Sequence, residues 1–116
     1  MQLHYKKLGD TGKPLLILHG LLGSLDNWMS LGKQWSETYQ VYLIDQRNHG
    51  RSPHADTHSY EAMAGDLLEF IETHNLRDVN LLGHSMGGKT VMEFVTKQAD
   101  LIEKLIVVDI APVQYK

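Results

Sequence analysis

Four short, nearly continuous apolar runs divide the chain, at residues 14–18, 41–44, 79–82 and 105–108. Runs of this kind are typical of strands that are covered on both faces of a sheet. Buried helix segments have the same pattern. Here, however, each run is short, is followed by Gly, Asp or His, and precedes helix-compatible sequence. The runs therefore predict four strands joined by crossover connections.

Amphipathic stretches lie between these runs. The longest begins after Ser59, which suits an N-cap, and ends near Asn75, which suits a C-terminal stop. Its apolar positions form one helical stripe: Tyr60, Met63, Ala64, Leu67, Leu68 and Ile71. Shorter stripes of the same period are Trp28, Leu31 and Trp35 behind an Asp26 cap, and Val91, Phe94 and Val95 after Ser85.

Alternation of strands and helices predicts an α/β fold, with a parallel sheet, right-handed crossovers and helices on both faces. Residues 3–8 are expected to add an antiparallel edge strand. No repeat, low-complexity tract or linker divides residues 1–116, so we expect a single unit with its own core.

Composition removes several function classes. The chain has no cysteine, which excludes a disulfide framework, a thiolate metal site and a cysteine nucleophile. Its 11 Lys and Arg against 14 Asp and Glu give a net charge of −3, which argues against nucleic acid or an anionic membrane as the main partner. No targeting peptide or membrane-length apolar run is visible near the N-terminus, so the expected compartment is the cytoplasm.

The pentapeptide Gly83-His-Ser-Met-Gly87 lies where the third apolar run ends and a helical pattern begins. This strand, turn and helix is the setting that a nucleophile elbow requires. Side chains at Gly83 and Gly87 would collide with the neighbouring elements, and Gly88 lets the helix approach more closely. The pattern predicts that Ser85 is exposed as a nucleophile at the carboxyl end of the sheet. The alternative is a glycine-rich turn with a capping serine.

A second motif, His19-Gly-Leu-Leu-Gly23, closes the first apolar run. In this architecture, the loop after that strand and the residue after the nucleophile each supply one backbone N–H to an oxyanion hole. We assign these donors to Leu21 and Met86. His19 is expected to hold the loop by hydrogen bonds, next to Gly20, and to take no acid-base role.

These two motifs and the loop Asp45-Gln-Arg-Asn-His-Gly-Arg-Ser52 together resemble the N-terminal half of the α/β-hydrolase superfamily. The phrases HGLLGSLDNW, DQRNHGRSPH and VVDIAPVQY are most similar to the YbfF-type bacterial esterases, whose relatives act on acyl esters and acyl-CoA thioesters. The resemblance covers essentially all 116 residues. It implies a fold that lacks its cap and C-terminal strands here, and it implies no metal or organic cofactor.

The loop at residues 45–52 has two interpretations. Arg47, His49 and Arg51 follow a strand, so they could meet an anionic acyl-CoA phosphate. We favour a turn made rigid by an ion pair between Asp45 and Arg47 and by Gly50.

The catalytic triad of this scaffold runs in the order Ser, acid, His, but no histidine follows Ser85. Asp109 ends the fourth apolar run, and the resemblance supports it as the acid; an Asp that caps the next turn is the alternative. The missing half of the fold is expected to bring the histidine and to cover the last strand. The isolated chain should therefore lack turnover and should self-associate or dissolve poorly.

The sequence thus predicts part of a serine carboxylesterase or thioesterase that acts on a small acyl ester or thioester through an acyl-enzyme. Its expected partner is the missing C-terminal half of the same fold, with no nucleic acid or membrane. Two alternatives stay open. The chain is a noncatalytic fragment that docks onto a complementary half, or it belongs to another serine-elbow hydrolase such as a perhydrolase or a carbon-carbon bond hydrolase.

Overall fold

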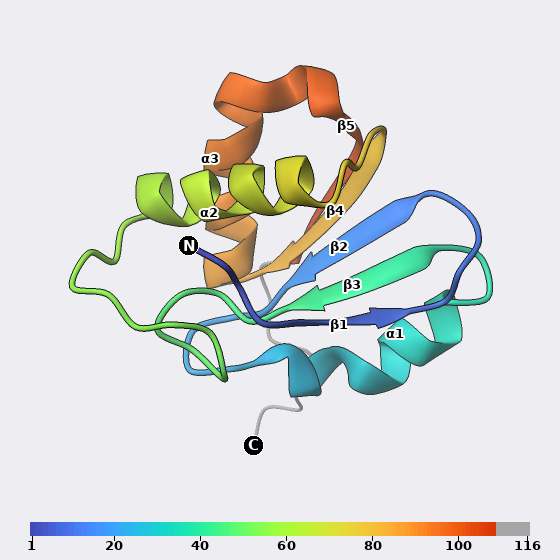
Figure 1. The fold of residues 1–116 in the computed structure, drawn as a ribbon, viewed down its shortest axis with the longest axis horizontal. Coiled ribbons are helices and arrows are strands. Elements are labelled where there is room, and N and C mark those ends of the chain that lie inside the picture. Colours follow the sequence, from blue (N-terminus) through green and yellow to red (C-terminus); the bar gives the residue numbers. More distant parts are fainter. Residues whose placement is uncertain (109–116) are drawn as a thin grey trace.

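The computed structural model describes residues 1–108, and it folds them into a five-stranded sheet of order β1-β3-β2-β4-β5 (Figure 1). The strands are β1 (Tyr5–Leu8), β2 (Pro14–Leu18), β3 (Gln40–Ile44), β4 (Val79–His84) and β5 (Ile102–Val108). Strands β2 to β5 pair in parallel, and β1 pairs antiparallel with β3. All four predicted strands and the antiparallel edge strand are confirmed.

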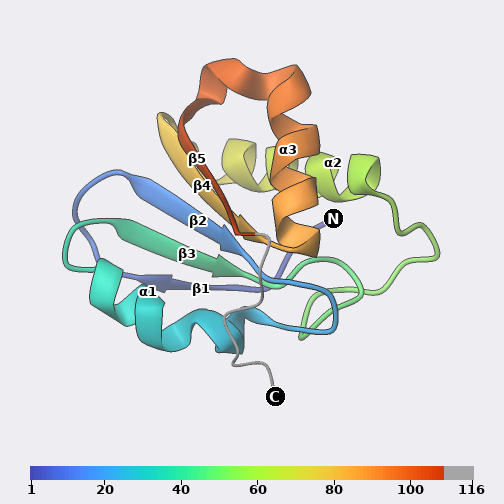
Figure 2. The same ribbon diagram turned by 180° about the vertical axis from the view of Figure 1, so that it is seen from behind.

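Helices cover both faces of the sheet. Helices α2 (Tyr60–Thr73) and α3 (Met86–Gln98) lie on one face (Figure 1). The other face carries the 3-10 helix η1 (Leu25–Trp28), followed by α1 (Met29–Trp35), and is seen from behind in Figure 2. A short 3-10 turn, η2 (Ala99–Leu101), connects α3 to β5. The predicted α/β class with two helical layers is confirmed.

Strand β2 explains why the apolar runs are continuous. Leu16 and Leu18 pack in the core beneath α2 and α3, together with Leu67, Phe70 and Phe94. The alternate residues of the same strand, Leu15 and Ile17, pack in the opposite core with Leu25 and Trp28. Since successive side chains of a strand point to opposite faces, only an unbroken apolar run serves both cores.

Helix ends follow the expected chemistry, with one correction. The Ser59 hydroxyl accepts a hydrogen bond from the Ala62 N–H at 3.0 Å, so Ser59 caps α2 as predicted. Asn75 lies just beyond this helix with a φ of 54°, the left-handed conformation typical of a helix stop. The predicted Asp26 cap is wrong. Ser24 caps η1 instead: its hydroxyl accepts from the Asp26 N–H, because the 3-10 helix begins at Leu25, two residues before the start that an Asp26 cap implies.

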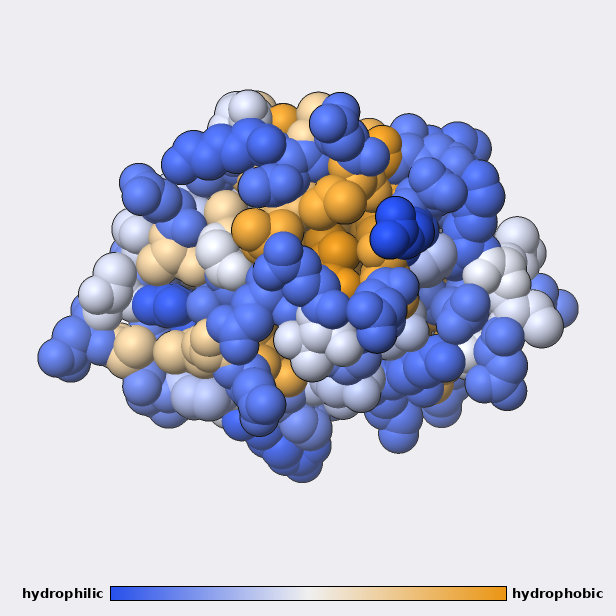
Figure 3. Space-filling model, turned by 45° about the horizontal axis from the view of Figure 1, so that its top comes forward, coloured by the Kyte–Doolittle hydropathy of each residue, from blue (hydrophilic) through white to orange (hydrophobic). Residues whose placement is uncertain are grey.

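Strand β5 forms one edge of the described sheet. It pairs with β4 alone within residues 1–108, and its side chains Leu105 and Ile106, on opposite faces of the sheet, are 40% and 48% exposed. A groove of about 470 Å³ opens nearby, between the C-terminal ends of α2 and α3, and Leu76 and Leu101 help to line it. Figure 3 shows apolar side chains gathered over this part of the helical layer. The bare edge predicted from the sequence is confirmed for the described residues.

Within residues 1–108, every helix falls short of the length and apolar character needed to cross a bilayer.

Candidate active site

Ser85 lies at the turn that joins β4 to α3, at the carboxyl end of the sheet. Its backbone has φ 54° and ψ −111°, an unfavourable conformation for a residue with a side chain. Hydrogen bonds hold the turn on both sides: the Ser85 N–H donates to the Val108 carbonyl at 2.9 Å, and the Lys89 N–H donates to the Ser85 carbonyl at 3.1 Å. The residue is exposed, so the turn presents its hydroxyl to solvent.

Three glycines make this turn sterically possible. A Cβ on Gly83 would lie 2.3 Å from the Gly87 carbonyl oxygen, and one on Gly87 would lie 2.2 Å from the Leu18 carbonyl oxygen. A Cβ on Gly88 would lie 2.9 Å from Cγ1 of Val107. The first two contacts involve backbone atoms that cannot turn aside, so α3 packs this closely on β2 and β4 only with glycine at both positions.

A pocket of about 360 Å³ opens beside Ser85. It is lined by side chains from the loop after β2, from the start of α2 and from the start of α3: Leu21, His58, Tyr60, Met63, Ser85, Met86 and Lys89. The structure therefore brings together Ser85 and the two residues predicted to supply oxyanion donors, Leu21 and Met86. Asp109, the predicted acid, lies outside the described residues.

Met86 and Leu21, the predicted oxyanion donors, lie in different local settings. Met86 is the first residue of α3, so its N–H has no acceptor within the helix. Leu21 is 61% exposed in a loop closed by the Gly23 N–H, which donates to the Gly20 carbonyl at 3.0 Å. A Cβ on Gly20 would lie 2.8 Å from Nδ1 of His84, so the loop packs directly against the elbow.

His19 is fully buried beneath this loop. Its Nδ1 lies 2.7 Å from the Gly20 carbonyl oxygen, and its Nε2 lies 3.0 Å from the Gln46 backbone nitrogen. An imidazole that donates from Nδ1 and accepts at Nε2 is neutral. Burial lowers the pKa of His19 below its ordinary value of 6.5, and this outweighs the opposing hydrogen bond to Gly20. His19 therefore holds backbone groups of two loops together, and it does not line the pocket of Ser85.

Gln46 and Thr90 extend this buried network, and the sequence analysis missed both. The Gln46 side-chain amide donates to the His19 carbonyl at 2.9 Å and accepts from the Thr90 hydroxyl at 2.9 Å. The Thr90 hydroxyl also lies 3.1 Å from the Met86 carbonyl oxygen. The network thus ties the loop after β2 to the first turn of α3. The only sequence signal was a polar residue, Gln46, directly after an apolar strand and its terminal Asp.

The loop at residues 45–52 corrects one prediction. Arg47 does not pair with Asp45; it forms two hydrogen bonds with Asp66 on α2, at 2.7 and 2.9 Å, and the charge and hydrogen bonds of Asp66 raise the pKa of Arg47. Asp45 instead accepts the backbone N–H groups of Leu25 and Arg51, at 2.7 and 3.0 Å. The sequence could not show that an aspartate nineteen positions away lies closer to Arg47 than the one two positions away.

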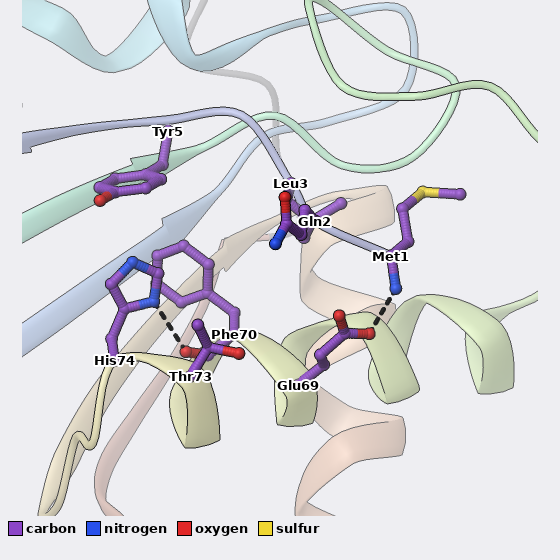
Figure 4. A pocket seen from close by; sticks show the side chains of 8 residues that line it. All are labelled: Met1, Gln2, Leu3, Tyr5, Glu69, Phe70, Thr73 and His74. Atoms are coloured by element: carbon purple, nitrogen blue, oxygen red, sulfur yellow. Dashed lines mark hydrogen bonds and ion pairs between the residues drawn. The ribbon is translucent and has the colours of Figure 1, made fainter.

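A second pocket, of about 220 Å³, lies between the N-terminal segment and α2 (Figure 4). Its charged and titratable groups have partners: the N-terminal ammonium contacts Glu69, and Nδ1 of His74 lies 2.9 Å from the Phe70 carbonyl oxygen. The Phe70 and His74 rings are stacked with centroids 4.1 Å apart. This pocket contains none of the predicted site residues.

Residues 13–114 match the model of the alpha/beta hydrolase fold, and the chain belongs to this family. It is 41% identical over 105 residues to esterase YbfF of Escherichia coli K12, and the alignment covers 90% of this chain and 41% of that protein. It is 44% identical over 117 residues to the mouse sn-1-specific diacylglycerol lipase ABHD11, covering 97% of this chain and 38% of that protein. The predicted superfamily is confirmed.

Among solved structures, the fold is similar to a marine microorganism esterase, with a TM-score of 0.92 and 59% sequence identity. That alignment covers 99% of this chain and 44% of the esterase. The chain therefore spans about two fifths of the length of these relatives.

Proposed function

We propose that this chain carries the nucleophile and the oxyanion hole of a serine hydrolase that cleaves small acyl esters. The observation that carries the proposal is the exposed, strained Ser85 at a pocket that Leu21 and Met86 also line. Relatives named as esterases and a diacylglycerol lipase support ester hydrolysis as the reaction. Thioesters, including acyl-CoA, belong to the same proposal because an acyl-enzyme forms from either bond. We keep the cytoplasm as the proposed compartment.

In the proposed reaction, the Ser85 hydroxyl attacks the acyl carbonyl and gives its proton to a histidine. The Leu21 and Met86 N–H groups bind the oxyanion that forms, and one such donor contributes about 3 to 4 kcal/mol of transition-state stabilisation. The histidine returns its proton to the leaving alcohol or thiol. Water, activated by the same histidine, then releases the acid and regenerates Ser85.

The histidine of this mechanism is proposed to come from outside these 116 residues, with Asp109 as the acid that orients it. The chain's own histidines all precede Ser85. His84 directs its ring toward Trp28, with centroids 5.9 Å apart, and His19 is buried. His58 does line the pocket of Ser85, so a His58→Asn variant is the direct check that it is not the base.

A second candidate function is favoured by the exposed edge of β5. A noncatalytic chain that docks onto a complementary half would use this edge and would need no intact Ser85. The two functions differ in one respect: only the enzyme loses its activity when Ser85 is changed.

The test uses a polypeptide that contains these residues together with the remainder of the fold, and it follows phenol release from phenyl pentanoate. We expect Ser85→Ala to lower kcat about 10⁴-fold or more. The control Ser30→Ala removes an exposed hydroxyl on α1, on the opposite face, and should leave kcat unchanged. Equal rates for the two variants would remove Ser85 from the mechanism, and a comparable loss in His58→Asn would make His58 the base.

A further inference from the structure

The pocket beside Ser85 carries positive charge. Its walls are mostly apolar, with Leu21, Tyr60 and Met63 among them, and its polar side chains other than Ser85 are Lys89 and His58. No carboxylate from residues 1–108 lines it. In a chain with a net charge of −3, a lysine in a pocket that no Asp or Glu of residues 1–108 lines needs a separate explanation.

Lys89 is held close to the pocket. It lies one turn after Ser85 on α3, so both residues share a helix face. Its Nζ lies 5.9 Å from the centroid of the Tyr60 ring, a cation–π distance, and both residues line the pocket.

The acids that could have neutralised Lys89 lie elsewhere. Among residues 1–108, none of the ion pairs within 4.0 Å involves Lys89. Glu93, one turn further along α3, and Glu61, next to Tyr60 on α2, line the groove between these helices together with Lys97. Glu93 is one turn from both lysines of α3, but it lines the groove with Lys97 and not the pocket with Lys89.

A bound substrate would strengthen the field of Lys89. Charges interact more strongly where water is displaced by apolar groups, and an ester that fills this pocket displaces water from beside Leu21 and Met63. An anionic group on that ester would then meet an ammonium that makes no ion pair within residues 1–108.

We propose that Lys89 is a specificity-determining residue, and that the site prefers esters carrying a carboxylate within reach of its Nζ. This inference rests on the proposed function, because it assigns a substrate class to the same pocket. His58, two residues before α2 begins, supplies a second polar side chain to this pocket.

The experiment uses the polypeptide that includes the remainder of the fold and compares three esters. Phenyl pentanoate is neutral, monophenyl glutarate places a carboxylate in the acyl half, and 3-carboxyphenyl pentanoate places it in the leaving group. Lys89→Met removes the charge with little change in length, Lys89→Arg restores it, and Lys97→Met is the matched control on the same helix.

We expect Lys89→Met to lower kcat/KM for one carboxylate ester about tenfold, mainly through KM, with phenyl pentanoate changed by less than about twofold. Lys89→Arg should recover most of the loss, and Lys97→Met should cause none. The ester that responds identifies the half of the substrate that Lys89 contacts. Equal effects of Lys89→Met on all three esters would overturn the inference. Failure of the proposed function is distinguishable, because it would appear as hydrolysis of phenyl pentanoate that survives Ser85→Ala.

Discussion

The turn around Ser85 and the strand β5 lie next to each other in the sheet but differ in how completely this chain surrounds them. At the turn, a Cβ on Gly83 or on Gly87 would lie 2.3 or 2.2 Å from a backbone oxygen, so neither position has room for a side chain. At β5, Leu105 and Ile106 are about half exposed and the outer edge has no partner within residues 1–108. The chain thus specifies the candidate nucleophile's geometry fully, whereas the sheet beyond it is left open.

The position of Ser85 and the proposed chemistry therefore depend on different parts of the protein. The position of Ser85 depends on contacts among β2, β4 and α3 and on the backbone of β5 that accepts its N–H, all of which this chain supplies. The proposed chemistry depends in addition on a histidine that the chain does not contain after Ser85. Substitutions at the turn should therefore affect folding itself, and substitutions at the edge should affect association.

The largest effect is expected from Gly87→Ala. Its Cβ would lie 2.2 Å from a backbone oxygen of β2, so α3 would have to move, and we expect a loss of about 3 kcal/mol or more in the free energy of unfolding, measured in urea. Gly65→Ala on α2 is the control, since its Cβ would meet no atom within 4 Å. That variant should gain about 0.5 to 1 kcal/mol. Similar stabilities for both variants would contradict the steric explanation.

The next effect concerns the buried network behind the turn. Gln46→Leu would leave the buried His19 carbonyl without its side-chain donor and would remove one of the acceptors of the Thr90 hydroxyl, and we expect a loss of about 2 kcal/mol in the same measurement. Gln34→Leu, an exposed position on α1, serves as the control and should change stability by less than about 0.5 kcal/mol. If the two leucine variants have the same free energy of unfolding, the network does not stabilise the loop.

At the open edge, Ile106→Lys tests association. We expect the isolated 116-residue chain to self-associate through β5, and a lysine on this edge should shift it toward monomer in sedimentation velocity, with stability changed by less than about 0.5 kcal/mol. Leu31→Lys, on an exposed position of α1, should not shift it. A wild-type chain that sediments as a monomer and melts cooperatively would show that the edge of β5 does not cause self-association.

The smallest effect is the titration of His19. Burial lowers the pKa of this imidazole below 6.5, so its neutral form contributes to stability fully above pH 6.5, and this contribution is lost as the pH falls through the lowered pKa. In NMR spectra, the His19 ring of the folded protein should titrate at a lower pH than the same ring in urea-unfolded protein, which should titrate near 6.5. The same pKa in the folded and the unfolded protein would contradict the burial of His19.

The sequence predicted the local features well because they depend on neighbours along the chain. Apolar runs marked the strands, Ser59 and Asn75 marked the ends of α2, and the glycine spacing marked the turn at Ser85. The features that the sequence did not predict depend on contacts between residues far apart along the chain. The pair of Arg47 with Asp66 joins a loop to a helix, and Lys89 and His58 reach one pocket from two elements that only the packing of α2 on α3 brings together.

The most direct measurement is the site of covalent labelling by a fluorophosphonate in the polypeptide that includes the remainder of the fold. Digestion and mass spectrometry should place a single adduct on the peptide that contains Ser85, and Ser85→Ala should abolish it while Ser30→Ala leaves it intact. An adduct on any other residue, or equal labelling of the Ser85→Ala variant, would show that the strained serine of this turn is not the nucleophile.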